Sequence, residues 1–288
     1  LCKLFGETMI ISDLHTALLP YLEATPNKQV FVLTDANVAS CYPTLIGKYP
    51  HCILPAGDNN KSLHSVELVW QFLLENGATR DALLLNIGGG MITDLGGFVA
   101  ATYMRGIRCV NIPTSLLAMV DASTGGKTGI NILGLKNLVG TFTQPSATLI
   151  YPPFLNTLSE NEILSGYAEM LKHGLIADPA HFYALLAIEL QMPYSELFAP
   201  LLSDSIQVKR QIVSADFQEK GLRKALNFGH TIGHAIEESY AVQGRTVAHG
   251  YCVLWGMVAE LYLSVIKMGC PRNVLTQMSH LMISLYGR

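Results

Sequence analysis

The sequence has little charge and no pattern of the kind that places a chain in a membrane or on a nucleic acid. Only 14% of its 288 residues are charged and the formal net charge is −3, so the basic surplus of nucleic-acid-binding proteins is absent. No uninterrupted apolar run reaches the roughly 18–20 residues that span a bilayer. The longest candidate, 250–270, is broken by Glu260 and Lys267 and predicts a buried helix. These absences predict a cytoplasmic protein without a nucleic-acid or membrane partner.

The first residues of the sequence and its cysteines also exclude some classes of protein. The first ten residues lack the basic start and apolar block of a signal peptide. They also lack an initiator Met, so we expect the true N terminus to lie upstream. No C-x-x-C pair is present, which argues against a cysteine zinc site or a disulfide framework and favours a reducing compartment. The six scattered cysteines are Cys2, Cys41, Cys52, Cys109, Cys252 and Cys270.

The first half of the chain alternates short apolar runs with helical patterns. The runs are often β-branched and bounded by Gly, Pro or Asp, which is typical of buried strands. A helical stretch at 62–78 ends at a glycine. Such alternation predicts an α/β domain with a mostly parallel, Rossmann-like sheet that binds ligands at the carboxyl ends of its strands. The expected strands are 29–35, 51–55, 81–90, 108–114 and 146–152.

The second half of the chain is predicted to be entirely helical. Pro152 and Pro153 interrupt the alternating pattern. Ser159 and Glu162 then have the spacing of a capping box, which predicts the start of a helix. We therefore place a domain boundary near residue 155, with an α/β domain at 1–155 and an all-helical domain at 156–288.

A glycine run at 86–97 follows one expected strand and precedes a helix. Gly88, Gly89 and Gly90 would let phosphate groups approach backbone N–H groups at the helix N terminus. The run is not the G-x-G-x-x-G pattern, and a tight strand-to-helix turn explains it equally well. Asp94 could accept a hydrogen bond from a ligand hydroxyl, or it could stabilise the first turn of the helix.

A second glycine-rich stretch, 120–140, contains the letters GGKT. The P-loop pattern requires glycine where Asp121 stands, so that interpretation fails. We expect a glycine-rich loop whose Lys127 and Lys136 suit an anionic substrate. The alternative is a pair of ordinary solvated lysines.

The expected helix 160–176 carries an apolar stripe on one side and polar residues on the other. Glu169 and Lys172 fall on the polar side. They would form either a solvated ion pair worth a few tenths of a kcal/mol or a carboxylate ligand beside a cation in a cleft. In both cases we expect a half-exposed Lys172 to contribute little to folding.

Three of the nine histidines, His230, His234 and His249, fall within twenty positions. Residues i and i+4 share a helix face, so spacing alone nominates His230 and His234 as metal ligands. The zincin glutamate is missing between them. With a carboxylate nearby, the cluster suits a divalent metal such as zinc with one open position. Spacing does not decide which imidazole stays free for proton transfer.

Six motifs together resemble the 3-dehydroquinate synthase family over about residues 30–265. They are GGGMITDLGGFVAATYMRG, IPTSLLAMVDASTGGKTGIN, GLKNLVGTFTQP, SGYAEMLKHGLI, KGLRKALNFGHTIGHAIE and VAHG. The resemblance implies a dehydroquinate synthase-like fold and a lyase of the shikimate pathway, which leads to chorismate and aromatic amino acids. It would convert 3-deoxy-D-arabino-heptulosonate 7-phosphate into 3-dehydroquinate and phosphate with catalytic NAD.

The resemblance also implies roles for individual residues. The metal ligands would be Glu169, His230 and His249, holding Zn²⁺ or alternatively Co²⁺, while His234 would contact substrate. Catalytic roles would fall to His234, Lys127, Lys172 and Asp121. Substrate would be bound by Arg105, Lys127, Lys136, Asn137, Lys172, Lys209, Arg223, Asn227 and His234. NAD would be bound by Asp35, Asn37, Asp58, Lys61, Gly89, Gly90, Asp94, Thr114, Ser115, Asp121, Lys127, Lys136 and Thr157. The family resemblance further implies a homodimer.

Two departures from the family pattern stand out, and three alternatives stay open. Asp58 stands where the family usually has Glu, which keeps the charge on a shorter side chain. Family members continue beyond Arg288 into a further helical segment with another lysine, so we expect the printed sequence to lack that part. The alternatives are a sedoheptulose 7-phosphate cyclase, a metal-dependent polyol dehydrogenase of the glycerol dehydrogenase type, and a scaffold-like fragment without activity.

Overall fold

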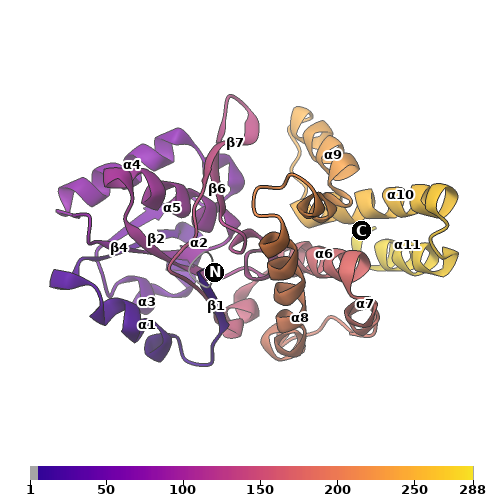
Figure 1. Ribbon diagram of the computed structural model, residues 1–288, viewed down its shortest axis with the longest axis horizontal. Helices are drawn as coiled ribbons and strands as arrows, with labels where there is room; N and C mark the ends of the chain where they lie inside the picture. The colour runs from indigo at the N-terminus through magenta and orange to yellow at the C-terminus, as the bar shows by residue number, and fades with distance from the viewer. Residues whose placement is uncertain (1–5, 288) are drawn as a thin grey trace. The chain divides into compact units, whose positions relative to one another are not determined.

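A computed structural model describes residues 6–287, apart from the side chain of Lys28. The chain divides into two compact units, Leu1–Thr157 and Leu158–Arg288. Among the described residues, Figure 1 shows strands only in the first unit. Cys2 lies outside the described residues, and the other five cysteines are free thiols.

The first unit is built on a six-stranded sheet in which every pair of neighbouring strands is parallel. The expected mostly parallel sheet is therefore confirmed. Three of the strands, β2, β4 and β8, are fully buried, as strands covered by helices on both faces should be. In spatial order β1-β8-β5-β4-β2-β3, the strands are Glu7–Ile10, Ala147–Ile150, Arg108–Pro113, Leu83–Gly88, Val30–Asp35 and His51–Leu54.

The two faces of this sheet follow from the alternation of side chains along each strand. Phe31 and Leu33 of β2 lie with Leu84 of β4 in the core under α4 (Leu63–Glu75) and α5 (Gly90–Thr102). Val32, beside Leu85 in the register, therefore points to the opposite face. Figure 1 shows α1 (Leu14–Glu23) and α3 (Pro43–Ile46) on that side, while α2 (Ala36–Cys41) follows β2 directly.

The stretch that we expected to be a glycine-rich loop is instead an antiparallel hairpin of β6 (Lys127–Ile132) and β7 (Leu135–Phe142). Its two-residue turn, Leu133 and Gly134, has positive φ at both positions, as type I′ hairpin turns require. Thr128 and Thr141 hydroxyls are 2.7 Å apart across the pair. Gly129 and Gly140 lie in the strands because a Cβ at either would meet the backbone opposite, so these glycines do not indicate a flexible loop.

Short helical turns join these elements. They are the 3₁₀ turns Pro26–Lys28, Asp58–Asn60, Tyr103–Arg105, Pro152–Thr157 and Leu222–Asn227, and the π turn Ala118–Ala122.

The second unit is all-helical from residue 160 onward, as predicted. The expected capping box is confirmed, since Ser159 Oγ accepts from the Glu162 amide and the Glu162 carboxylate accepts from the Ser159 amide. Trp255 and Tyr286 join α10 to α11 through a 3.3 Å hydrogen bond. The long helices are α6 (Glu160–Ala177), α7 (Pro179–Leu186), α8 (Tyr194–Ala215), α9 (His230–Val242), α10 (His249–Met268) and α11 (Arg272–Tyr286).

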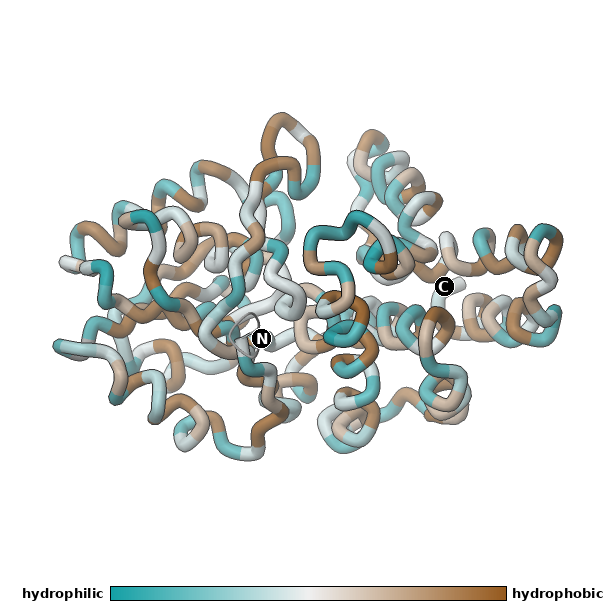
Figure 2. Tube along the Cα trace, viewed as in Figure 1, coloured by the Kyte–Doolittle hydropathy of each residue, from teal (hydrophilic) through white to brown (hydrophobic). Residues whose placement is uncertain are grey.

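Helix α10 is the one helix in the described part of the chain that is long and apolar enough to cross a membrane. Its buried residues include Val253, Leu254, Met257 and Leu261, as in a core helix. Figure 2 shows alternating apolar and polar segments along both α10 and α11 rather than one continuous apolar stretch. The expected buried helix is thus present, with one face buried.

Candidate metal centre and sheet edge

Three helices of the second unit come unusually close together because glycines stand where they cross. A Cβ on Gly233 of α9 would lie 2.8 Å from the Cys252 carbonyl oxygen of α10. A Cβ on Gly256 of α10 would meet the Gly229 backbone, and one on Gly250 would meet the Ser165 backbone of α6. These contacts leave no room for a methyl group, so glycine allows side chains from α6, α9 and α10 to meet at one point.

The start of α9 is held by a partly buried carboxylate. Gly229 has φ of 81°, a conformation that favours glycine. Its amide donates a 2.8 Å hydrogen bond to Glu260 Oε2 of α10. Glu260, which interrupts the apolar sequence of α10, therefore fixes the backbone directly before His230.

His230 and His249 both approach the same carboxylate oxygen of Glu169. His230 Nε2 lies 3.6 Å from Glu169 Oε1, and His249 Nε2 lies 3.8 Å from the same oxygen. The Nδ1 atoms of the two rings are held from behind, by the Phe228 carbonyl at 3.2 Å and by Glu237 Oε2 at 3.4 Å. Both rings therefore present Nε2 to the carboxylate.

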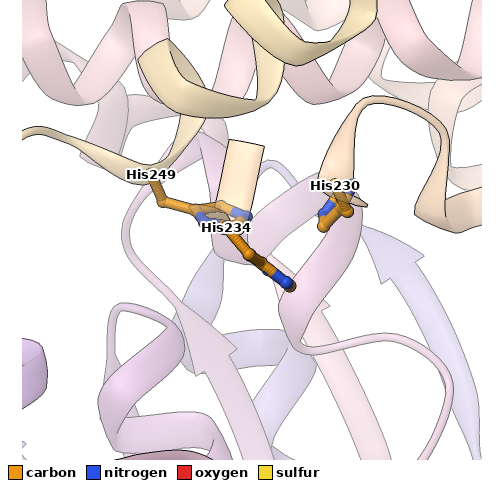
Figure 3. Close-up of side chains that lie close together, drawn as sticks. All are labelled: His230, His234 and His249. Atoms are coloured by element: carbon orange, nitrogen blue, oxygen red, sulfur yellow. The ribbon is translucent and has the colours of Figure 1, made fainter. Parts of the chain in front are cut away.

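His234 joins the cluster but occupies a different place in it. One nitrogen of each of His230, His234 and His249 lies within 4.8 Å of the others. Figure 3 shows the three rings grouped together. His234 is the exposed member, whereas His230 and His249 are partly buried. The prediction from spacing brought His230 and His234 together correctly, and the third histidine comes from the next helix.

The donor set fits a zinc ion. Zinc–nitrogen and zinc–oxygen bonds of about 2.0–2.2 Å at tetrahedral angles place two donors about 3.4 Å apart, close to the 3.6 and 3.8 Å separations here. One carboxylate with two imidazoles is a ligand combination found in catalytic zinc sites. Burial lowers the pKa of His230 to about 4, despite the opposing effect of Glu169. The ring is therefore neutral near pH 7, the form that binds metals.

The expectation of a half-exposed Lys172 is wrong, and the alternative of a solvated ion pair is excluded with it. Lys172 forms an ion pair with Glu169, and each side chain is 1% exposed. Helix α6 is buried all round from Ile163 to Gly174 rather than along one stripe. Lys172 therefore compensates the burial of a carboxylate, and its positive charge contributes to lowering the pKa of His230.

In the first unit, the predicted cofactor residues lie along the carboxyl edge of the sheet. Each group directly follows a strand, and the four strands β5, β4, β2 and β3 are neighbours. This edge is where parallel sheets bind ligands. The groups are Thr114 and Ser115 after β5, Gly89 and Gly90 after β4, Asp35 and Asn37 at and after the end of β2, and Asp58 and Lys61 after β3.

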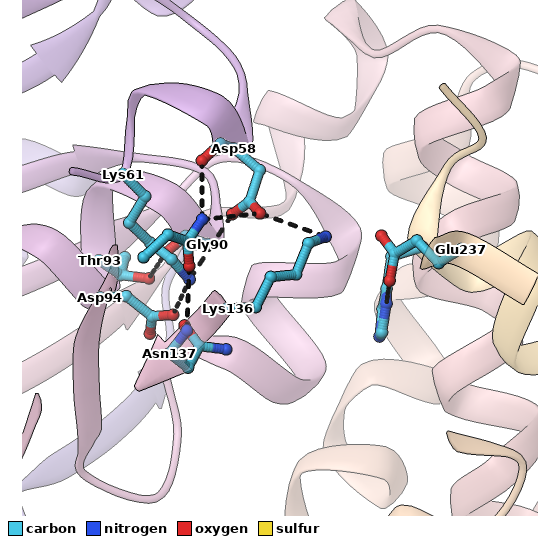
Figure 4. Close-up of polar contacts among 10 residues, drawn as sticks. Asp58, Lys61, Gly90, Thr93, Asp94, Lys136, Asn137 and Glu237 are labelled. Atoms are coloured by element: carbon cyan, nitrogen blue, oxygen red, sulfur yellow. Dashed lines mark hydrogen bonds and ion pairs between the residues drawn. The ribbon is translucent and has the colours of Figure 1, made fainter. Parts of the chain in front are cut away.

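Polar contacts tie these loops together (Figure 4). Lys61, which is 4% exposed, donates a 3.0 Å hydrogen bond to Asp94 and lies 3.6 Å from Asp58. Lys136 of the hairpin lies 3.3 Å from Asp58. Burial raises the pKa of Asp58, but the Lys61 and Lys136 ammonium groups outweigh it and keep the pKa below its ordinary value. Asp58 thus remains ionised near pH 7.

The remaining predicted residues differ in burial. Lys209 and Arg223 are 6% and 2% exposed. Arg223 Nη1 donates to the Phe217 carbonyl at 2.7 Å, and the exposed Asn227 donates to Glu219 at 3.1 Å. Asp121 lies in the π turn, and Thr157 accepts or donates a 2.9 Å hydrogen bond with Tyr42. Arg105, Lys127, Lys136 and Asn137 are exposed as well.

Sequence reasoning missed three acidic residues that contact the predicted site residues or the backbone beside them. Glu237 contacts His249, Glu260 caps α9, and Glu219 accepts from Asn227. A lone glutamate in the apolar sequence of α10 was a signal for Glu260. Glu237 lies seven residues after His230 on α9, so helical periodicity could have placed it on the histidine face.

Comparison with known proteins identifies similar chains. Residues 51–165 match the family described as 3-dehydroquinate synthase N-terminal, and residues 166–286 match 3-dehydroquinate synthase C-terminal. The 3-dehydroquinate synthase of Parabacteroides distasonis is 45% identical over 97% of this chain and 81% of its own length.

Two solved structures are similar along almost the whole chain. A 2-epi-5-epi-valiolone synthase from Streptomyces hygroscopicus subsp. jinggangensis, with NAD⁺ and Zn²⁺ bound, has a TM-score of 0.87 at 27% identity, covering 99% of this chain and 82% of that one. A 2-deoxy-scyllo-inosose synthase, complexed with carbaglucose-6-phosphate, NAD⁺ and Co²⁺, has a TM-score of 0.80 at 22% identity, covering 96% and 77%. The second similarity supports the fold.

Proposed function

Since this chain belongs to the 3-dehydroquinate synthase family, we propose that it converts 3-deoxy-D-arabino-heptulosonate 7-phosphate into 3-dehydroquinate and phosphate. The reaction is a phosphate-eliminating cyclisation in the shikimate pathway. It requires a hydroxyl to be oxidised and later restored, a proton to be removed and phosphate to leave.

The observation that carries the proposal is the convergence of two imidazole nitrogens on Glu169 Oε1. Glu169, His230 and His249 would hold Zn²⁺ or Co²⁺. When bound, this metal would polarise a substrate hydroxyl, while NAD would accept a hydride and return it.

The carboxyl edge of the sheet would bind NAD. Gly89 and Gly90 at the start of α5 leave the backbone open for the phosphates. The ionised Asp58 and the residues Asp35 and Asn37 would accept hydrogen bonds from the nucleoside end. Support comes from the position of these loops at neighbouring strand ends.

The cationic residues would bind and orient the substrate. Buried Lys172, Lys209 and Arg223 already have restricted positions, so little side-chain entropy is lost when they bind an anion. The exposed His234 lies beside the proposed ligands, and histidine is a common general acid and base in enzymes. Lys127, Asp121, Arg105, Asn137 and Asn227 would complete the substrate contacts.

We further propose a cytoplasmic homodimer that takes this small phosphorylated sugar acid as its substrate. Family membership supports this proposal. The two rival activities, a sedoheptulose 7-phosphate cyclase and a polyol dehydrogenase, are not favoured by the family match.

A substrate comparison tests the proposal. We expect the purified protein with zinc and NAD to release phosphate from the heptulosonate phosphate much faster than from sedoheptulose 7-phosphate, without net accumulation of NADH. Preference for sedoheptulose 7-phosphate would identify the other cyclase activity. Stoichiometric NADH from a simple polyol would identify a dehydrogenase, and either result would overturn the proposal.

A further inference from the structure

Glu237 is the anionic partner of a proposed metal ligand. Its Oε2 lies 3.4 Å from His249 Nδ1, while the other ring nitrogen of His249 faces Glu169 Oε1 at 3.8 Å. The imidazole thus lies between two carboxylates. We propose that Glu237 is a positioning residue that holds His249 in the tautomer and orientation required for metal binding. This inference rests on the metal site of the proposed function.

The periodicity of α9 explains how Glu237 reaches His249. Residues 230, 234 and 237 follow the i, i+4, i+7 pattern and share one helix face. His249 is the first residue of α10, which packs against α9 through Gly233 and Gly256. The same face of α9 therefore carries the proposed ligand His230 and also Glu237, which contacts the proposed ligand His249 of α10.

The hydrogen bond decides which nitrogen is available to a metal. A carboxylate only accepts, so Nδ1 of His249 must carry the proton. Nε2 then holds the lone pair and points to the oxygen shared with His230. An anionic acceptor also increases the electron density on the imidazole, which makes it a stronger ligand.

The two histidines are supported by different groups. His230 Nδ1 lies 3.2 Å from the neutral carbonyl of Phe228, whereas His249 has a carboxylate. His249 is also more exposed, with 29% of its side chain accessible against 14% for His230. The more exposed ring has more freedom to turn, so it gains more from a charged partner.

Two variants separate the parts played by the hydrogen bond and by the charge. Glu237→Ala removes both, and Glu237→Gln keeps an acceptor oxygen while removing the charge. Glu238→Gln is a matched control, because Glu238 is the next residue of the same helix and is exposed. Support of metal ligands by such partners typically contributes about 10- to 100-fold in affinity.

The experiment measures Zn²⁺ affinity by competition with a chromophoric chelator. We expect about 10- to 100-fold weaker binding in Glu237→Ala, a smaller loss in Glu237→Gln, and wild-type affinity in Glu238→Gln. The visible spectrum of bound Co²⁺ should change in Glu237→Ala and stay as in the wild type in Glu238→Gln. The metal-free unfolding temperatures of Glu237→Gln and Glu238→Gln should be alike, which excludes a merely structural effect.

The failures of the two proposals are distinguishable. A wild-type protein that binds no stoichiometric Zn²⁺ would overturn the metal site itself. Stoichiometric wild-type binding with unchanged Zn²⁺ affinity and Co²⁺ spectrum in Glu237→Ala would overturn the role of Glu237 and leave the metal site standing.

Discussion

At the scale of single residues, Glu169 in the second unit is buried next to several ionisable side chains. Its carboxylate contacts Lys172, His230 and His249 within the described structure. Burying an ionised carboxylate is costly unless a partner compensates it. The same residues that would bind a metal therefore also determine whether this region folds without one.

Replacing Lys172 tests this dependence. We expect Lys172→Ala to lower the free energy of unfolding of the metal-free protein by about 3–5 kcal/mol, because Glu169 would remain buried without its cation. Urea denaturation measures the change. The control is Lys224→Ala, which removes an exposed lysine. Equal stability of the two variants would mean that Lys172 is energetically a surface residue, as its place in the sequence first indicated.

At the scale of secondary-structure elements, helices α7 and α8 are joined by a buried polar contact away from the proposed site. His181 Nε2 lies 2.7 Å from Ser205 Oγ, and the two residues are 2% and 0% exposed. Burial lowers the pKa of His181 below 6.5, although Asp204 and Asp178 oppose the effect. The folded protein therefore keeps this ring neutral at pH values where the unfolded chain begins to bind a proton.

This difference predicts a loss of stability in mild acid. Above pH 6.5, His181 is neutral in both the folded and the unfolded state. Below pH 6.5 the unfolded state binds more protons, so the free energy of unfolding decreases as the pH is lowered. This residue contributes at most about 1.4 kcal/mol per pH unit to that decrease. Between pH 6.5 and the lowered pKa of His181 in the folded protein, we expect the free energy of unfolding of His181→Gln to decrease less steeply than that of the wild type. His64→Gln, at an exposed position in α4, should match the wild type. Parallel pH profiles for all three proteins would contradict this prediction.

The elements were predictable where the sequence pattern reflects burial. The buried strands β2, β4 and β5 follow from continuous apolar runs, and the capping box predicted the start of α6. The edge strand β1 was missed because none of its four residues is fully buried, so the sequence there has no continuous apolar run. The hairpin was missed because Gly129 and Gly140, which are required by close backbone contact, were interpreted as signs of a loop.

The site was predictable in a different sense. Helical spacing placed His230 and His234 together, and family resemblance added Glu169 and His249. Periodicity within one helix carries no information about a crossing between helices, so the contact of Glu237 with His249 required the structure. The burial of Lys172 was likewise hidden, because α6 is enclosed on the polar side of its sequence pattern too.

At the scale of the whole molecule, each unit carries its own set of predicted binding residues. The first has a parallel sheet whose adjoining strand ends carry the proposed NAD contacts. The second has three helices that bring a carboxylate and imidazoles to one point. We propose that both sets serve one reaction, in which NAD would be regenerated in every cycle.

The most direct test counts phosphate released from 3-deoxy-D-arabino-heptulosonate 7-phosphate with sub-stoichiometric NAD and added Zn²⁺, with and without a chelator. The account predicts many phosphates per NAD, loss of release with the chelator, and its recovery when Zn²⁺ is restored. No more than one phosphate per NAD, or release that is unchanged by complete metal removal, would contradict it.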